Sequence, residues 1–312
     1  MSVSQIEFPI KTPQEFNLDK VMQAVTVLQE AAAGQELLHP HAEVKIATTR
    51  PVLLSIFSDL HIGDAHSDYP TMLDHLKMVR DQPEAYACFI GDEVNLMTFK
   101  NLARQELLPH ELQGLLAFRM LQELDALGKI AFVGTGNHND FRDGFYREFF
   151  DSLRAPLIGP NMGTVNLTVG EQLYRIFEFH KLSMGNSSMS PLLRQRRAQE
   201  FLSPDADIYI GAHTHRKALA VEMLGGLRGT ASEPKLRVLV EAGSYKLADG
   251  FQWSQGNVRM RGFDYGGTSV MLYPHEHRMV PYYDIAEGIR ALRVDQKMRE
   301  ILGKKAGELL GK

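Results

Sequence analysis

Four short segments of this chain carry Asp, His and Asn side chains, whose oxygen and nitrogen atoms can bind metal ions. In chain order they are Asp59-Leu60-His61, Gly91-Asp92, Gly136-Asn137-His138 and Gly211-Ala212-His213-Thr214-His215. These ligand types hold divalent cations, and a pair of such cations can activate a water molecule for hydrolysis. Each segment follows a short apolar run that is typical of a buried strand. One Asp-x-His alone would indicate a turn, but four ligand-bearing strand ends in one chain predict a metal centre.

Short strands that alternate with helices must position these residues. The predicted strands are residues 52–57, 85–90, 130–133, 174–179, 208–210 and 236–240, and the predicted helices are 70–80, 102–127 and 191–202. A run at 269–273 follows the turn signal Gly266-Gly267 and predicts an added antiparallel strand. This alternation favours a layered α/β domain. Because ligand sites in layered α/β folds gather at the carboxyl ends of strands, we expect the metal-type side chains at one edge.

The chain divides by pattern into a core and two extensions. Residues 1–50 read as an N-terminal extension with a helix over 16–33, which Gly34 ends. Residues 51–285 hold the strands and the metal-type segments. Residues 286–312 are charged, with apolar residues at helical spacing, and predict a C-terminal helical tail.

The composition narrows the class of protein. The 312 residues are 44% hydrophobic with a net charge of -4, so no overall basic field attracts nucleic acid, although a local basic patch stays open. The single cysteine, Cys88, excludes an internal disulfide framework and suits a reducing compartment. No apolar run reaches the roughly 18–20 residues of a membrane span. The first 14 residues lack the apolar region of a signal peptide. We therefore expect a cytoplasmic protein without a membrane partner.

The polar segments resemble the motifs of the calcineurin-like metallophosphoesterases. That family's pattern is D-x-H, G-D-x-x-[DN], G-N-H-[DE], an isolated His and G-H-x-H. The matching residues here are 58–61, 91–95, 136–139, His180 and 211–215, and the likeness covers roughly residues 51–284. The resemblance implies a two-sheet β-sandwich flanked by helices, which the strand and helix pattern fits.

The resemblance also implies a ligand set for two divalent ions. One ion would be held by Asp59, His61, Asp92 and His215, and the other by Asp92, Asn137, His180 and His213. Asp92 would bridge the two, because a shared carboxylate offsets the repulsion between dications about 3.5–4 Å apart. The lack of cysteine ligands favours Mn, Fe or Zn without choosing among them.

The activity that the resemblance implies is hydrolysis of a phosphomonoester or phosphodiester by a metal-bridging hydroxide. His138 stands at the position of the family's non-ligand His, which protonates or hydrogen-bonds the leaving oxygen. Asn139 replaces the acidic residue that usually follows, and Asp140 comes one position later. Asn95 and Asp140 are expected to support the ligands rather than to bind metal.

Several readings stay open for the substrate. Nucleotides and nucleic acid are the leading classes. Arg194, Arg196 and Arg197 on one predicted helix are either a phosphate-reading patch or a solvated face. The patch would suit a nuclease in a DNA-processing assembly. A non-catalytic binding scaffold of the same fold is a further alternative, but such a protein would have lost several ligands, and here every ligand position holds a competent residue.

Overall fold

The computed structural model describes residues 41–96, 107–138, 150–182, 192–224, 235–246 and 265–309, with side chains described up to residue 302 and not at residue 224. The chain divides into the units Met1–Leu38 and His39–Lys312, and the fold below is that of the second unit. The helix predicted at 16–33 lies outside the described residues.

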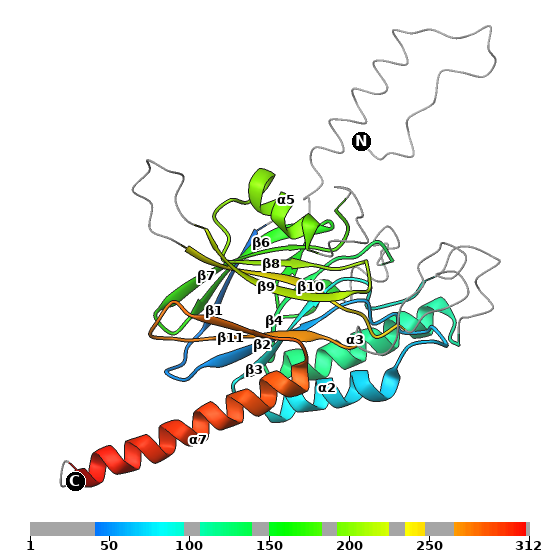
Figure 1. Cartoon of the computed structure of the whole chain (residues 1–312). Coiled ribbons are helices and arrows are strands. Elements are labelled where there is room, and N and C mark those ends of the chain that lie inside the picture. The colour runs from blue at the N-terminus through cyan, green and yellow to red at the C-terminus, as the bar shows by residue number, and fades with distance from the viewer. Residues whose placement is uncertain are drawn as a thin grey trace, which may run out of the picture. The chain divides into compact units, whose positions relative to one another are not determined.

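Two six-stranded mixed sheets form the framework of this unit (Figure 1). The first has the order β12-β11-β2-β3-β4-β5. Strands β2 to β5 run parallel, and β11 and β12 add antiparallel strands beside β2. The bounds are β2 Val52–Phe57, β3 Ala85–Ile90, β4 Ile130–Gly134, β5 Leu157–Ile158, β11 Thr268–Leu272 and β12 Met279–Tyr282.

The second sheet has the order β1-β6-β7-β8-β10-β9. β7, β8 and β10 are parallel neighbours, while β6 and β9 are antiparallel to β7 and β10. β1 pairs in parallel with β6, so part of residues 1–50, expected as an extension, belongs to this sheet. The bounds are β1 His41–Ile46, β6 Met162–Val169, β7 Gln172–Phe179, β8 Ile208–Gly211, β9 Lys217–Leu224 and β10 Lys235–Ala242.

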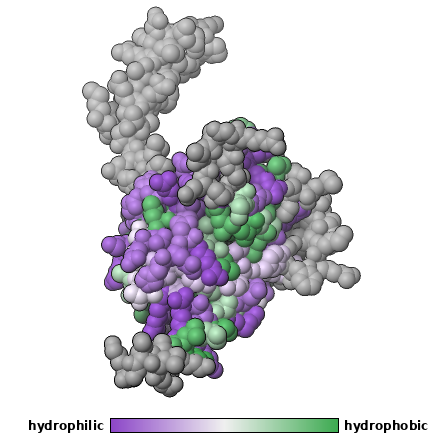
Figure 2. Space-filling model, turned by 60° about the vertical axis from the view of Figure 1, so that its left-hand side comes forward, coloured by the Kyte–Doolittle hydropathy of each residue, from purple (hydrophilic) through white to green (hydrophobic). Residues whose placement is uncertain are grey.

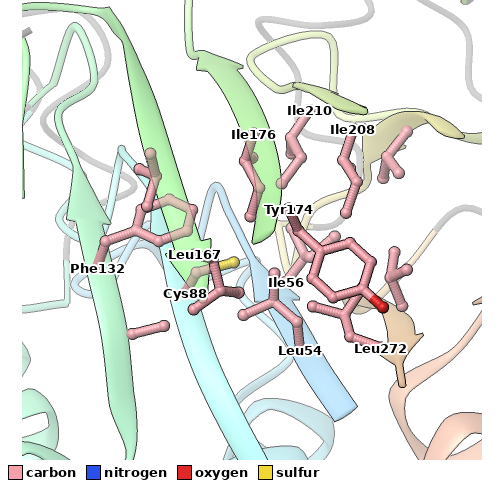
Figure 3. Packing of buried hydrophobic residues seen from close by; sticks show 14 of the residues in the cluster. Leu54, Ile56, Cys88, Phe132, Leu167, Tyr174, Ile176, Ile208, Ile210 and Leu272 are labelled. Atoms are coloured by element: carbon pink, nitrogen blue, oxygen red, sulfur yellow. The ribbon is translucent and has the colours of Figure 1, made fainter. Parts of the chain in front are cut away.

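The space between the sheets is filled by apolar side chains from both (Figure 3). Leu54, Ile56 and Cys88 of the first sheet face Ile176 and Ile208 of the second. Along β2, Leu53 and Phe57 point the other way, toward the helices. Because both of its faces are covered, β2 is buried at every position, and its sequence is apolar except for one serine.

Helices cover the outer faces of both sheets. α2 (Tyr69–Asp81), α3 (His110–Ala126) and α7 (Ile285–Leu309) lie on the first sheet, and α5 (Leu193–Phe201) lies on the second (Figure 1). None of the helices that the structure describes is both long and apolar enough to cross a membrane. Figure 2 shows a face whose described surface is largely hydrophilic, with smaller apolar areas between. The prediction of a two-sheet α/β fold flanked by helices is confirmed.

Most predicted elements are present, with shifts at their ends. β2 and β3 have the predicted bounds, and α7 spans most of the predicted tail. Of the helix expected at 102–127, the described part begins at His110 with Pro109 as its N-cap, and residues 102–106 lie outside the described residues. Strands β1, β5, β6, β9 and β12 were not predicted.

The first half of α7 packs tightly on the first sheet at Gly288. A Cβ atom there would lie 2.2 Å from Ser269 Oγ and 2.9 Å from Leu53 Cδ1. We predict that Gly288→Ala lowers the melting temperature, because overpacking typically costs about 1–3 kcal/mol and alanine returns at most about 1 kcal/mol of helix propensity. Thermal unfolding of the two proteins measures the difference.

A second substitution separates the clash from other effects. Ser269→Ala removes the hydroxyl that a new Cβ would meet, so the double variant should recover part of the lost stability. Equal losses for Gly288→Ala with and without the Ser269→Ala change would contradict this close packing as the cause.

Candidate metal centre

The residues expected to bind metal have an unusual backbone. Seven non-glycine residues of the described chain have positive φ, and five of them are expected ligands. These five are Asp59 (51°), His61 (46°), Asp92 (55°), His213 (72°) and His215 (56°). Such conformations are rare for non-glycine residues and cost about 1–3 kcal/mol each unless the surroundings enforce them. Their concentration at the strand ends indicates that a strained backbone orients these side chains.

The first group of ligand-type atoms joins the end of β2 to the turn after β8. His215 Nε2 lies 3.1 Å from Asp59 Oδ1, and His61 Nε2 lies 3.7 Å from the same oxygen. The two Nε2 atoms are 3.2 Å apart. One oxygen and two ring nitrogens therefore converge on a point that one cation can occupy.

The second group joins the ends of β3, β7 and β8. It consists of Asp92, His180 and His213, whose ligand atoms lie within 4.8 Å of one another. His180 Nε2 is 2.9 Å from Asp92 Oδ2, and the rings of His180 and His213 meet edge to face. This group has the same donor types as the first.

Asp92 connects the two groups. It also forms a third group with His61 and His138, so it shares one neighbour with the first group and belongs to the second. The backbone N–H of His138 donates to Asp92 Oδ1 at 2.7 Å, which leaves Oδ2 directed at the ring nitrogens. Asp92 is thus placed as a carboxylate that two neighbouring cations could share.

The donor set fits divalent cations. Asp59 Oδ1, Asp92 Oδ2 and His180 Nε2 are buried, and despite their close approach none forms a hydrogen bond of good geometry with the described residues. Buried polar atoms normally have such partners, and leaving one without costs about 1–3 kcal/mol. Metal ions bound in the two groups would satisfy all three atoms.

Hydrogen bonds on the outer side of the ligands fix their orientation. His180 Nδ1 is 2.7 Å from the carbonyl oxygen of Ile90, and His61 Nδ1 is 3.1 Å from Asn95 Oδ1. When these nitrogens donate, each Nε2 keeps a lone pair for a metal. Ser58 Oγ donates to Asp59 Oδ2 at 2.6 Å, so Oδ1 is the free oxygen of that carboxylate.

The charges within the centre balance one another. Burial raises the pKa values of Asp59 and Asp92, but the neighbouring histidines, His180 foremost, outweigh it and hold both pKa values below their usual range. Burial lowers the pKa of His180, yet Asp92 and Asp59 outweigh it and raise this pKa to about 10. Burial and nearby His180 lower the pKa of His213 to about 4. One protonated histidine thus offsets the carboxylates in the metal-free protein, and a cation could replace that proton.

His138 has a different setting from the ligands. Its Nδ1 hydrogen-bonds the carbonyl oxygen of Asn95, and its Nε2 lies 3.9 Å from Asp92 Oδ2. The ring is partly exposed at the edge of the centre. It can therefore exchange a proton with a molecule bound next to Asp92.

The remaining residues that the sequence analysis singled out lie in different environments. Asn137 follows β4 at this edge with its side chain exposed, and Asn95 contacts His61 as expected of a supporting residue. Asp140 lies outside the described residues. Arg196 is exposed and pairs with Glu222, and Arg197 is half-buried.

Arg194 does not have the placement expected of a phosphate-reading residue. It is only 3% exposed and forms an ion pair with the buried Glu241. The physical reason is the geometry of α5, since residues 194 and 196 point about 200° apart around a helix axis. Of the three arginines, Arg194 therefore faces the sheet, while Arg196 faces solvent.

Several buried charged residues around the centre were not anticipated, among them Glu178, Glu241 and the pair formed by Lys246 and Asp64. Glu178 on β7 is fully buried, and burial raises its pKa to about 8. Glu241 lies near the end of β10, and Lys246 Nζ lies 2.7 Å from Asp64 Oδ2. Glu178 and Glu241 each interrupt an apolar strand, which is a signal that could have marked them. Nothing in the sequence around Lys246 distinguishes it from a surface lysine.

Comparisons of sequence yield no assignment. No family model matches the chain, and no curated protein matches it.

Solved structures show likenesses of low identity. The chain is similar to the NAD nucleotidase of Haemophilus influenzae (TM-score 0.39, 11% identity), with 74% of this chain covered. It spans only 50% of that nucleotidase's length. It is also similar to Vps29 of Chaetomium thermophilum (TM-score 0.36, 14% identity, 75% of this chain and 95% of that one). A third likeness is to the calcineurin-like phosphoesterase YfkN of Bacillus subtilis (TM-score 0.38, 11% identity, 82% of this chain and 99% of that one).

The fold assignment rests on the arrangement of this chain's own elements. Two mixed six-stranded sheets pack face to face, helices cover their outer faces, and metal-type side chains gather where the strands end. This two-sheet α/β architecture is the one that the resemblance to the calcineurin-like metallophosphoesterases implies.

Proposed function

We propose that this protein is a dimetal phosphoesterase that hydrolyses a phosphomonoester or phosphodiester. The observation that carries the proposal is the pair of ligand groups, Asp59-His61-His215 and Asp92-His180-His213, together with the third group in which Asp92 meets His61 of the first. Three buried ligand atoms without hydrogen-bond partners support a resident cation rather than a purely structural cluster. The filled ligand positions speak against a non-catalytic scaffold.

The ligands divide between two ions. Asp59, His61 and His215 would hold one, and His180, His213 and Asn137 the other, with Asp92 serving both. When bound, the two ions, with Mn, Fe or Zn as the candidates, lower the pKa of water and neutralise charge on phosphoryl oxygens. The Asp and His ligands include only two carboxylates, so the loaded site keeps a positive charge that attracts a phosphate ester.

His138 would handle the leaving group. With Nδ1 held by the carbonyl of Asn95, its Nε2 is the nitrogen turned toward the centre. A ring protonated on both nitrogens can donate the Nε2 proton to the oxygen that departs from phosphorus. The hydrogen bond from the His138 backbone N–H to Asp92 keeps the His138 ring beside the ligands.

A substrate panel tests the proposal directly. The purified protein is assayed with added Mn²⁺ on p-nitrophenyl phosphate, bis-p-nitrophenyl phosphate, nucleotides and single- and double-stranded DNA. Nucleotides and nucleic acid are the leading classes, and a preference for DNA would favour the nuclease alternative. Two bound ions without hydrolysis of any of these esters would contradict the proposal.

We predict that Asp92→Asn loses at least one ion and most activity. The neutral amide cannot offset the repulsion between two dications, and losing a cation removes several kcal/mol of transition-state stabilisation, which is about 100-fold in rate or more. Metal analysis and turnover of the purified variant measure both effects. Asp81→Asn, an exposed carboxylate at the end of α2, is the matched control. Full metal content with wild-type turnover in Asp92→Asn would refute the shared carboxylate.

We predict that His138→Ala keeps both ions and slows hydrolysis by about 10²–10⁴-fold for esters with poor leaving groups. The loss should shrink for p-nitrophenyl phosphate, because p-nitrophenolate departs without a proton. Rates on an alkyl phosphate and on p-nitrophenyl phosphate give the comparison. An equal loss on both substrates argues against a leaving-group acid, and a loss of metal would make His138 a ligand.

We predict that metal affinity rises with pH between about 7 and 9. The pKa of His180 is raised to about 10 in the metal-free protein, so at these pH values the ring holds a proton that metal must displace. One proton released when the ion of the His180 group binds corresponds to about tenfold in the affinity for that ion per pH unit. Calorimetry in buffers of different ionisation enthalpy counts the protons.

The stability of the metal-free protein should move the opposite way. Because the pKa of His180 is raised on folding, its stabilising contribution is complete below the ordinary histidine pKa of 6.5 in the unfolded chain and is lost as the pH rises toward about 10. The melting temperature of the metal-free protein should therefore fall over this range. Metal affinity that is independent of pH would contradict the assignment of His180 as the protonated ligand.

A further inference from the structure

A buried ion pair lies directly behind the turn that carries two of the proposed ligands. Helix α5 packs on β8 and β10 (Figure 1) and brings Arg194 against Glu241, which are 3% and 0% exposed. Arg194 Nη2 donates to the carbonyl oxygen of Ala212 at 2.5 Å and to Glu241 Oε1. We propose that Arg194, Glu241 and Thr214 are positioning residues that hold His213 and His215 in their metal-binding conformations. The inference rests on the proposed metal centre.

Thr214 is the link between the ion pair and the histidines. Its hydroxyl donates to Glu241 Oε1, and its backbone N–H donates to the carbonyl oxygen of Ala212 at 2.9 Å. Both flanking residues have left-handed backbone, His213 with φ 72° and His215 with φ 56°. Such a turn relaxes unless contacts outside it enforce the conformation. The network therefore holds the turn through two hydrogen-bonding groups, the Thr214 hydroxyl and the Ala212 carbonyl.

Glu241 is the best satisfied member of this network, whereas the buried Gln195 Oε1 has no hydrogen-bond partner among the described residues. Glu241 also accepts from Gln195 Nε2 at 2.5 Å, and Gln195 Nε2 contacts the carbonyl oxygen of Val240 at 2.9 Å. A buried carboxylate is tolerated where charge and hydrogen bonds compensate it, and Glu241 accepts from Arg194, Gln195 and Thr214. A Cβ at Gly211 would lie 2.5 Å from Gln195 Nε2 and 2.8 Å from Phe179 Cζ, so a larger residue here would have to displace these side chains.

The network reaches a third ligand through Phe179. The guanidinium of Arg194 lies over the Phe179 ring, 5.3 Å from its centroid, and the N–H of Ala212 donates to the Phe179 carbonyl at 3.2 Å. His180 is the next residue in the chain. Arg194 therefore contacts both strand ends, β7 and β8, that supply histidines to the second ligand group.

A change in this network should affect both ions, whereas the loss of one ligand should affect mainly one. His213 belongs to one ligand group and His215 to the other, and Thr214 lies between them. Loosening Thr214 should therefore weaken both ions together, whereas removing His215 should weaken mainly one. Residues that orient metal ligands typically change affinity by about 10–100-fold.

The test compares Thr214→Val with Thr214→Ser in the full chain. Valine keeps the shape but removes the hydroxyl, while serine keeps the hydroxyl that donates to Glu241. We expect Thr214→Val to bind both Zn²⁺ ions about 10–100-fold more weakly in competition with a chromophoric chelator, and Thr214→Ser to bind nearly as the wild type does. The visible spectrum of the Co²⁺-loaded protein should shift in Thr214→Val, which a change confined to stability would not cause.

Two controls fix the interpretation. Arg196→Ala removes an exposed ion pair from the same helix, so it should leave Zn²⁺ affinity unchanged. His215→Ala defines the effect of losing one ligand. Far-UV circular dichroism and the melting temperature of each metal-free variant verify the fold.

The outcomes separate this inference from the proposed function. Wild-type affinity for both ions in Thr214→Val overturns the positioning role while the phosphoesterase stands. A wild-type protein that binds two ions but hydrolyses no ester refutes the function, and weakened binding in Thr214→Val still supports the positioning role. A wild-type protein that takes up no Zn²⁺ overturns both.

Discussion

Two carboxylates with almost no exposure to solvent, Asp59 and Asp92, impose the main constraint on this structure. A buried carboxylate is costly unless cations, hydrogen bonds or both compensate it. Here each has one oxygen held by donors of the chain and one directed at histidine nitrogens. A proton on His180 compensates part of this charge in the metal-free protein, and a pair of divalent cations would compensate it more fully. The sheets, turns and flanking ion pairs can be understood as the means of holding these two groups together.

The sheet topology explains how distant segments reach one place. β2, β3 and β4 are parallel neighbours in one sheet, as are β7 and β8 in the other, so their carboxyl ends open at the same end of the sandwich. Tight apolar packing between the sheets fixes their separation and therefore the gap between Asp59 and His215. The strained backbone at the ligands is tolerated because these strand ends are anchored on both sides. The rigid core thus holds the strand ends in place and allows their strained backbone to persist.

The sequence predicts the interior of this fold better than its edges. β2 and β3 were predicted with their bounds because both of their faces are buried, which produces unbroken apolar runs. β6 alternates between buried and half-exposed residues, so its apolar content is diluted and it was missed. The candidate ligand residues could be recognised because they stand next to the predictable strands, and metal binding by them stays a prediction. The role of Arg194 was not predictable, since its partner Glu241 is 47 positions away and no periodicity within α5 shows which face meets the sheet.

A second buried ion pair suggests that support of the ligand loops is a general feature of this centre. On the side of β2, Lys246 Nζ lies 2.7 Å from Asp64 Oδ2 and 3.4 Å from Asn95 Oδ1, and Asn95 in turn contacts His61. Burial lowers the pKa of His61, and the charge of Lys246 adds to this effect, so the ring stays neutral as a metal ligand must be. Arg194 and Glu241 have the corresponding place behind His213 and His215. Each pair is neutral as a whole, so it can orient the candidate ligands without changing the net charge of the proposed metal centre. A charged residue without its partner at either position would alter that charge and would thereby change affinity as well as geometry.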